Sequence, residues 1–405
     1  MSEQSQLDEY RSRARAWLAE HAAEYATPRE FSEAELVARS KAWVRKKFDA
    51  GYSAIAEPTS AGGAGGSAQQ AAIFAQEEAR YHTPTFTGVS IGFAMTMAAV
   101  KRHGTPEQYN HFGTLTHRGD ITWCQLFSEP AAGSDLAGLR TRAVKNGDSW
   151  VVNGQKVWSS WAHHADWGIL IARSDPTLPK HNGLTFFLVD MKSPGVEVRP
   201  IRQITGNSDF NETFLTDVVV PDGNRIGAEG EGWACCMTVL ATERNQSRTG
   251  GSGRGDRPGS VRALIRQAAA TPRDGGSALD SQAARAKLAR WFVQEQGLKN
   301  FAARLSAQAK TGDPLPPTVA LVKLISATLL QQTQAFLMDL DEYAGAFSTE
   351  EHDREEVFYQ YLWSSALRIA GGADEVLRNQ LAERALEMPG EMRADKGVPF
   401  NELPY

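Results

Sequence analysis

The chain has 405 residues, more than a single hydrophobic core normally holds, which predicts two or three domains. Its 43 Lys and Arg against 48 Asp and Glu give a net charge of −5 with the two signs mixed, so nucleic acid is not an expected partner. The three cysteines lack metal-ligand spacing, the N-terminus is polar, and no long apolar run occurs, which predicts a cytoplasmic protein without a membrane span.

Residues 5–118 are expected to be mostly helical. In the first stretch, apolar side chains recur at helical spacing at Leu7, Tyr10, Ala14, Trp17 and Leu18. A glycine-rich loop at 51–66 then interrupts the pattern, and no Lys-Ser/Thr pair follows it as a phosphate-binding loop requires. Helical periodicity resumes at 71–80 and 90–103.

A buried strand is predicted at 121–127, and it stops at Ser128-Glu129-Pro130. Proline cannot donate to a sheet ladder and keeps the preceding residue extended, so a rigid loop follows the strand. Residues 131–134, Ala-Ala-Gly-Ser, leave almost no side chain there. Such a bare loop allows the backbone to approach a flat ligand closely.

Two Asn-Gly pairs, at 146–147 and 153–154, are typical of the two-residue turns that close hairpins. They predict short strands at 150–152 and 155–158. The second strand ends in Trp158-Ser159-Ser160-Trp161, an aromatic wall with two hydroxyls.

The rest of the middle region also reads as short strands, which favours a small antiparallel barrel or sandwich. The runs lie at 167–172, 184–189, 196–201 and 213–220. His163 and His164 lie between the aromatic segment 158–161 and the strand expected at 167–172. We assign no chemistry to them, because neighbouring histidines are more often part of a solvated turn than of a metal site.

Beyond Gly232 the pattern is helical again. An apolar stripe is expected at Trp233, Cys236, Met237 and Leu240, and its next position is Glu243. A carboxylate on an apolar face is explained either by an ion pair or by a role as a general base with a pKa raised by desolvation. The residues alone leave both interpretations open.

Residues 246–259 are interpreted as a flexible linker, and helical patterns follow at 281–310, 316–345 and 354–369, which suits an antiparallel bundle. Gly371-Gly372 then lead into a helix with Asp374 and Glu375 in its first turn, where acidic residues are favoured.

Taken together, these motifs resemble the acyl-CoA dehydrogenase family. Its Glu-Pro-x-Ala-Gly-Ser-Asp loop, Asn-Gly-x-Lys hairpin and Trp-x-Ser/Thr stand here at 129–135, 153–156 and 158–160. The resemblance implies an α+β fold with an N-terminal helical domain at 1–119, a small antiparallel β-barrel or sandwich at 120–229 that cradles a flavin, and a C-terminal four-helix bundle at 230–405.

The resemblance also implies a function in lipid metabolism. It implies FAD as cofactor, a CoA thioester as substrate, α,β-dehydrogenation, an electron-transferring flavoprotein as acceptor, and a homo- or hetero-oligomer. The flavin-contacting positions of the family match Phe127, Ser128, Gly133, Ser134, Trp158, Ser159 and Ser160. Ser134 and Arg244 match substrate-contacting positions, and the backbone N–H of Gly371 matches a donor to the thioester oxygen.

Two departures from the family pattern concern the catalytic base and a flavin contact. The family's usual catalytic Glu falls on Gly371, and a flavin-contacting Thr falls on Ala373. One branch of the family carries its base in a Leu-x-x-Glu-Arg helix, which stands here at 240–244, so the resemblance and the apolar stripe both indicate Glu243.

Two alternatives stay open. The segment at 359–368 resembles bacterial chains that work as unlike pairs on steroid or other bulky acyl-CoA, so a non-catalytic partner subunit is one alternative. A flavin monooxygenase or desulfinase is the other, and Glu243 argues against it because neither chemistry needs an α-proton base.

Overall fold

The computed structural model describes residues 2–25, 32–249, 260–273, 275–310, 316–340 and 355–403. The chain divides into two compact units. The first consists of Met1–Gln203, Asn207–Glu243 and Arg393–Tyr405, and the second of Ile204–Gly206 and Arg244–Met392. In the part of the chain that is described, no helix combines the length and the apolarity needed to cross a membrane.

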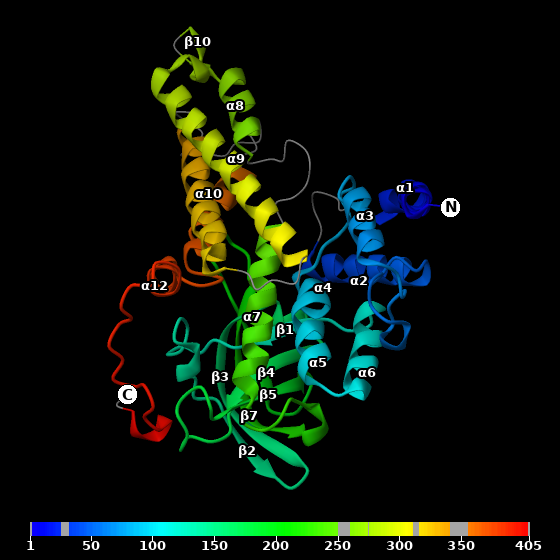
Figure 1. Cartoon of the computed structure of the whole chain (residues 1–405), viewed down its shortest axis with the longest axis vertical. Coiled ribbons are helices and arrows are strands. Elements are labelled where there is room, and N and C mark those ends of the chain that lie inside the picture. Colours follow the sequence, from blue (N-terminus) through cyan, green and yellow to red (C-terminus); the bar gives the residue numbers. More distant parts are fainter. Residues whose placement is uncertain are drawn as a thin grey trace. The chain divides into compact units, whose positions relative to one another are not determined.

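Helices form the N-terminal part of the first unit, as the periodicity predicted (Figure 1). They are α1 (Glu3–Tyr25), α2 (Glu33–Asp49), α3 (Ala68–Glu78), α4 (Thr87–Ser90), the π-helix Ile91–Thr96, α5 (Met97–His103) and α6 (Pro106–His117). Reciprocal capping boxes begin three of them, at Ser32 with Glu35, Ser67 with Gln70, and Thr105 with Gln108. Each box satisfies backbone N–H groups that a helix start leaves without partners.

The middle region forms one mixed sheet in the order β6-β7-β3-β2-β4-β5-β8, with β1 beside β4. The strands are β1 (Trp123–Leu126), β2 (Arg142–Asn146), β3 (Ser149–Ser160), β4 (Trp167–Arg173), β5 (Leu184–Asp190), β6 (Val196–Ile201), β7 (Phe210–Pro221) and β8 (Arg225–Ile226). Most neighbours are antiparallel, but β1 runs parallel to β4. The Asn146-Gly147 turn joins β2 to β3 as predicted, with Gly147 at φ 61°.

The second Asn-Gly turn was predicted wrongly. Asn153 and Gly154 lie inside β3, which pairs with β7 on both sides of them and changes register there. A Cβ on Gly154 would lie 2.3 Å from Thr141 Oγ1, so the glycine allows β3 to approach closely the residue that precedes β2. The predicted strands at 150–152 and 155–158 are therefore one strand.

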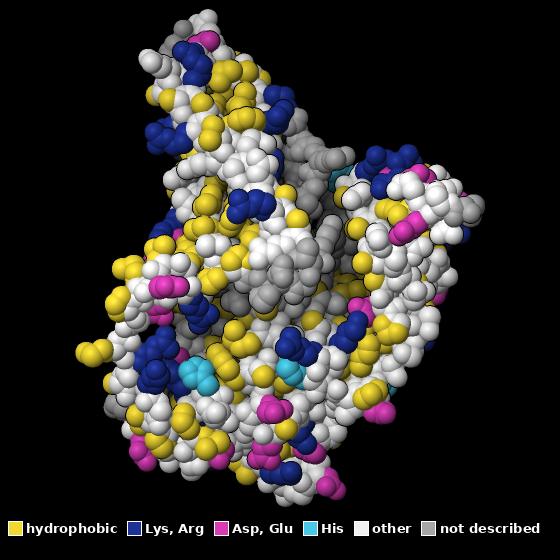
Figure 2. All heavy atoms as spheres, in the orientation of Figure 1, with side chains coloured by type: hydrophobic (Ala, Val, Ile, Leu, Met, Phe, Trp, Pro, Cys, Tyr) yellow, Lys and Arg dark blue, Asp and Glu magenta, His cyan; other side chains and the backbone are white. Residues whose placement is uncertain are grey.

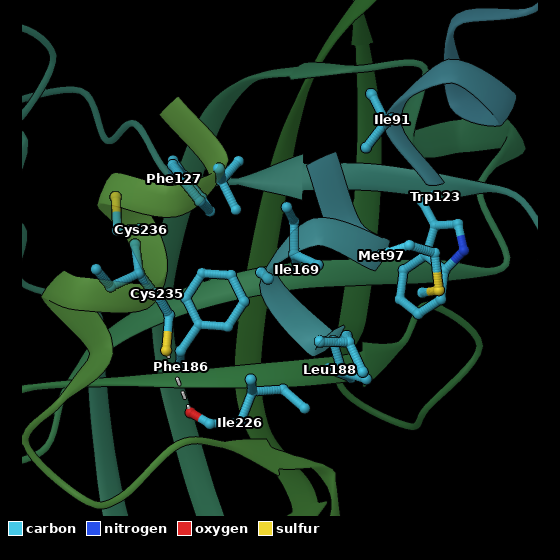
Figure 3. Close-up of a cluster of buried hydrophobic side chains, with 14 of the residues drawn as sticks. Ile91, Met97, Trp123, Phe127, Ile169, Phe186, Leu188, Ile226, Cys235 and Cys236 are labelled. Carbon is cyan, nitrogen blue, oxygen red and sulfur yellow. Dashed lines mark hydrogen bonds between the residues drawn. The ribbon is translucent and has the colours of Figure 1, made fainter. Parts of the chain in front are cut away.

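One hydrophobic core joins the π-helix, α5 and α6 to one face of the sheet (Figure 3). Trp123 of β1, Ile169 of β4 and Phe186 of β5 are fully buried in it. Helix α7 (Gly232–Thr249) adds Cys235, whose thiol donates to the Ile226 carbonyl at 3.6 Å. The core therefore holds the N-terminal part of α7 against the sheet. On the face of this unit in Figure 2, basic and acidic side chains are interspersed.

The second unit is a bundle of antiparallel helices. It contains α8 (Val261–Ala270), α9 (Gln282–Lys310), α10 (Ala320–Leu340), α11 (Glu355–Ser364) and α12 (Asp374–Ala385), with the small hairpin β9 (Pro272–Arg273) and β10 (Gly276–Ser277). Leu264, Trp291 and Phe336 bury against one another and join α8, α9 and α10.

Two expectations for this region change. Helix α8 was not predicted. The linker expected at 246–259 is contradicted at its start, because α7 is helical through Thr249. The remaining residues of that prediction, 250–259, lie outside the described chain.

Candidate active site

The loop after β1 has the open, nearly side-chain-free form that the sequence predicted. Phe127 is buried and packs edge-on against Phe186, with ring centroids 5.9 Å apart. The Ser128 carbonyl accepts a hydrogen bond from the Val157 N–H at 2.9 Å, which ties the loop to β3. A Cβ on Gly133 would meet nothing within 4 Å, so space is left over the loop at this point.

A buried ion pair fixes this loop to β3. Lys156 Nζ lies 2.8 Å from Glu129 Oε1 and 2.9 Å from the Phe127 carbonyl oxygen. Glu129 also accepts the N–H groups of Arg140 at 2.6 Å and Thr141 at 2.9 Å. Burial by itself would raise the pKa of Glu129, but Lys156 and these donors outweigh it and hold the pKa below its usual value, so Glu129 is ionised at neutral pH.

Trp158 presents its indole ring to solvent. The side chain is 58% exposed although it stands on a central strand, and its φ is 61°, a left-handed conformation that is uncommon for a non-glycine residue. The register of β3 and β7 shifts between Lys156 and Ser159, which marks a bulge, and this bulge turns the Trp158 ring toward solvent. Backbone strain of this kind clusters at functional sites.

The hydroxyls beside Trp158 include one that is buried without a partner. Ser159 is fully buried, and its Oγ has no hydrogen-bond partner among the described residues. Its register neighbour Asn211 donates Nδ2 to the Ser159 carbonyl at 2.9 Å, while no described residue hydrogen-bonds to Asn211 Oδ1. Ser160 is half-buried at the end of the strand. Buried polar atoms normally have partners, so these atoms indicate a further binding partner.

The far end of the loop is held by a second ion-pair network. Lys180 contacts both carboxylate oxygens of Asp135 at 2.8 Å and also pairs with Asp395 of the C-terminal tail. Burial would lower the pKa of Lys180, but these two carboxylates outweigh it and raise the pKa. Because Asp135 directly follows Ser134, the tail contributes to the position of the loop.

Glu243 lies on the buried side of α7. Cys236 and Val239 are fully buried, and Glu243 is half-buried seven and four residues farther along the same face. Met237, which was predicted on this stripe, is 37% exposed, so that assignment was wrong. The helix turns about 100° per residue, which carries position 237 away from the face of 236 and 239. The side chain of Arg244 lies outside what the structure describes.

In the second unit, the glycine pair before α12 adopts left-handed backbone conformations. Gly371 has φ 66° and Gly372 has φ 98°, so a side chain at either position would be strained. Lys323 Nζ donates to the Gly372 carbonyl at 2.7 Å and to Asp374 at 2.9 Å. This lysine holds the turn in place.

Asp374 itself is buried and engaged. Arg368 Nε lies 2.5 Å from its Oδ2, opposite Lys323. Burial would raise the pKa of Asp374, but the two cations outweigh it and lower the pKa. An ionised, fully paired carboxylate is a poor proton acceptor. The next residue, Glu375, has a side chain that is 80% exposed.

These features fit a flat aromatic cofactor. An exposed indole, a bare loop and an unpaired buried hydroxyl occur within two adjacent segments of the first unit, and FAD offers a planar ring with polar edges. Phe127, Ser128, Gly133, Ser134 and 158–160 all lie in these two segments. Glu129, Lys156 and Lys180 were not predicted as positioning residues, although the motifs contain the first two.

The family models match nearly the whole chain. The acyl-CoA dehydrogenase N-terminal domain matches residues 4–119, the middle domain 124–218 and the C-terminal domain 230–386. The chain belongs to the acyl-CoA dehydrogenase family. Acyl-CoA dehydrogenases are FAD-dependent oxidoreductases, which agrees with the fit described above.

Three known proteins show the range of similarity. Acyl-CoA dehydrogenase FadE34 of Mycobacterium tuberculosis is 40% identical over 290 residues, which cover 72% of this chain but only 38% of FadE34. Acyl-CoA dehydrogenase IpdE1 of Mycolicibacterium smegmatis is 34% identical over 96% of this chain and 99% of its own length. The solved structure of the Tcur3481-Tcur3483 steroid acyl-CoA dehydrogenase has a TM-score of 0.76 at 25% identity, covering 96% of this chain and 99% of that one.

Proposed function

We propose that this chain catalyses the α,β-dehydrogenation of an acyl-CoA thioester, with Glu243 as the base that takes the α-proton. The observation that carries the proposal is the strained, exposed Trp158 beside Ser159, whose buried hydroxyl has no partner among the described residues, on a strand that is hydrogen-bonded to the small-residue loop after β1. We assign FAD binding to Phe127, Ser128, Gly133, Ser134, Trp158, Ser159 and Ser160. When bound there, FAD supplies an acceptor for the β-hydride.

The choice of Glu243 rests on comparison with the other carboxylates considered. Asp374 is held by Lys323 and Arg368, and Glu375 points into solvent. Glu243 continues a face of α7 whose preceding members are fully buried, where a carboxylate is partly shielded from water. A general base needs such an environment to accept a proton near neutral pH.

Loss of an α-proton puts negative charge on the thioester oxygen, so a donor aimed at that oxygen is needed. We assign this role to the backbone N–H of Gly371, which a glycine retains, and we place the acyl-CoA also against Ser134 and Arg244. An electron-transferring flavoprotein is the proposed electron acceptor. The division into 1–119, 120–229 and 230–405 is part of the same proposal.

A second candidate is a subunit that completes a flavin site together with an unlike chain. Gly371 and Ala373 lack the side chains that the family usually has there, and the name Tcur3481-Tcur3483 joins two components. That protein is described as a steroid acyl-CoA dehydrogenase, which supports a bulky, steroid-like acyl group as the substrate class. In this arrangement the oligomer contains this chain and a homologous partner.

Anaerobic reduction of the bound flavin by an acyl-CoA substrate separates the two candidates. Glu243→Gln should slow this reduction by on the order of 10²–10⁴-fold while the FAD content stays unchanged. Glu375→Gln, on an exposed carboxylate, is the matched control and should have no effect. If Glu243→Gln is as fast as the wild type in complex with its partner chain, the base belongs to the partner and the second candidate holds.

A further inference from the structure

Three side chains from two distant segments converge in the first unit. Glu33 is the first residue of α2, while His163 and His164 end the short 3₁₀-helix Ala162–His164 that follows β3. Nε2 of His163 lies 3.0 Å from Glu33 Oε2, and Nε2 of His164 lies 3.3 Å from the same oxygen. The three ligand atoms all lie within 4.8 Å of one another.

An aromatic frame holds the two imidazoles. Trp161 stacks on His163 with an interplanar angle of 20°, and Phe86 stands edge-on against Trp161 at 5.2 Å and against His164 at 6.5 Å. Trp161 has a left-handed φ of 55°, and its N–H donates to the Asp209 carbonyl at 2.7 Å. The ring positions are thus determined by surrounding structure, unlike those of histidines in a solvated turn.

A second carboxyl group lies beside this cluster. Asp209 is 9% exposed, and its pKa is raised by burial and by the negative charge of Glu33, while His163 opposes the increase. The two imidazoles therefore lie beside the Glu33 carboxylate and close to a second, buried carboxyl group. A bound cation would be attracted to these carboxyl groups.

The geometry and the donor types point to a metal ion. We propose that Glu33, His163 and His164 bind one divalent transition-metal ion with the ligand preferences of zinc, with solvent in the remaining position. Two imidazoles and one carboxylate are a common zinc donor set, whereas magnesium and calcium favour oxygen ligands alone. The side chain of Glu33 is 42% exposed, so the ion can enter from solvent.

The ion would have a structural consequence at the candidate active site. It would join the start of α2 to the segment that directly follows Trp158, Ser159 and Ser160. The binding of the metal itself does not depend on the proposed dehydrogenation, and the two fail independently.

Metal binding to the full-length holoprotein, with any partner chain present, tests the proposal. After treatment with a chelator, the protein should take up one Zn²⁺ per chain by calorimetry, and Co²⁺ should give the visible absorption of a four-coordinate site. Changes in residues around metal ligands commonly weaken binding 10–100-fold, so Glu33→Gln and His164→Gln, which alter ligands directly, should weaken it by more than about 100-fold. His111→Gln, an exposed histidine on α6, is the control and should bind normally.

Thermal unfolding gives a second readout, because a ligand that binds only the folded state raises the unfolding temperature. Zn²⁺ should raise it for the wild type and the His111 control but not for Glu33→Gln. Glu33 is half-exposed at a helix start, so this variant is expected to fold. If wild type and Glu33→Gln bind Zn²⁺ equally, the three residues form only a hydrogen-bonded cluster and the proposal is overturned.

Discussion

Lys156 Nζ and Glu129 Oε1 lie 2.8 Å apart with no exposed surface on the lysine and 8% on the glutamate. This pair joins the loop after β1 to β3, so it connects the two segments assigned to FAD. Both partners come from motifs that the sequence separates by 27 positions. Their contact explains why the two motifs occur together.

Lys156→Met should destabilise the first unit strongly. It leaves the Glu129 carboxylate buried without its cation, and breaking one partner of a buried pair typically costs about 3–5 kcal/mol. The measurement is the urea midpoint at pH 7 for wild type and variant. Lys192→Met is the control, since Lys192 is 76% exposed and its contact with Asp166 should contribute about 0–1 kcal/mol. Equal midpoints for Lys156→Met and wild type would contradict the prediction.

Trp158→Ala should weaken FAD binding by roughly tenfold. A stacked aromatic pair contributes about 0.5–1.5 kcal/mol beyond its buried area, and each 1.4 kcal/mol is a tenfold change in affinity. Flavin fluorescence on titration into apoprotein measures the dissociation constant. Val219→Ala, an exposed apolar residue on β7 of the same sheet, should leave it unchanged. If both variants bind FAD like the wild type, the indole does not contact the cofactor.

Lys180→Met should loosen the loop from its far end. The ammonium joins Asp135 to Asp395, and hydrogen bonds between charged groups contribute about 1.5–3 kcal/mol each. We expect Lys180→Met to be less stable than the wild type and also to bind FAD somewhat more weakly. Lys180→Arg should restore both properties. Removal of residues 393–405 should reproduce the loss, because Phe400 also covers the Arg173 guanidinium at 3.5 Å. An unchanged affinity in the truncated chain would show that the tail plays no part in positioning the loop.

Glu77 should make the N-terminal helices sensitive to acid. Hydrogen bonds from Arg15 and Arg11 lower the pKa of this buried carboxylate to about 2 from 4.5. A lowered folded-state pKa contributes stability that is complete above the unfolded value and is lost as pH falls from 4.5 toward 2. Glu77→Gln should therefore be less stable than wild type at pH 7 and should lose less on acidification. Parallel stability curves for the two proteins would contradict this.

Local patterns in the chain were sufficient to predict much of the architecture. The N-terminal helices, the strand that ends before Pro130, the Asn146-Gly147 hairpin and the glycine pair before α12 each depend on residues close in sequence, whose backbone preferences act locally. Fold class and family could be predicted on the same basis, because the motifs keep their order and spacing. The amphipathic pattern of α8 was present as well but was not recognised.

Long-range contacts explain the rest. Asn153-Gly154 has turn chemistry, yet pairing along β7 keeps it in a continuous strand, because sheet hydrogen bonds outweigh a local turn preference. The Glu129–Lys156 pair, the tail on Lys180, and Glu33 beside His163 join positions far apart in the chain. No local propensity encodes contacts between residues so far apart in the sequence. Burial and charge pairing determine these contacts only once the chain has folded.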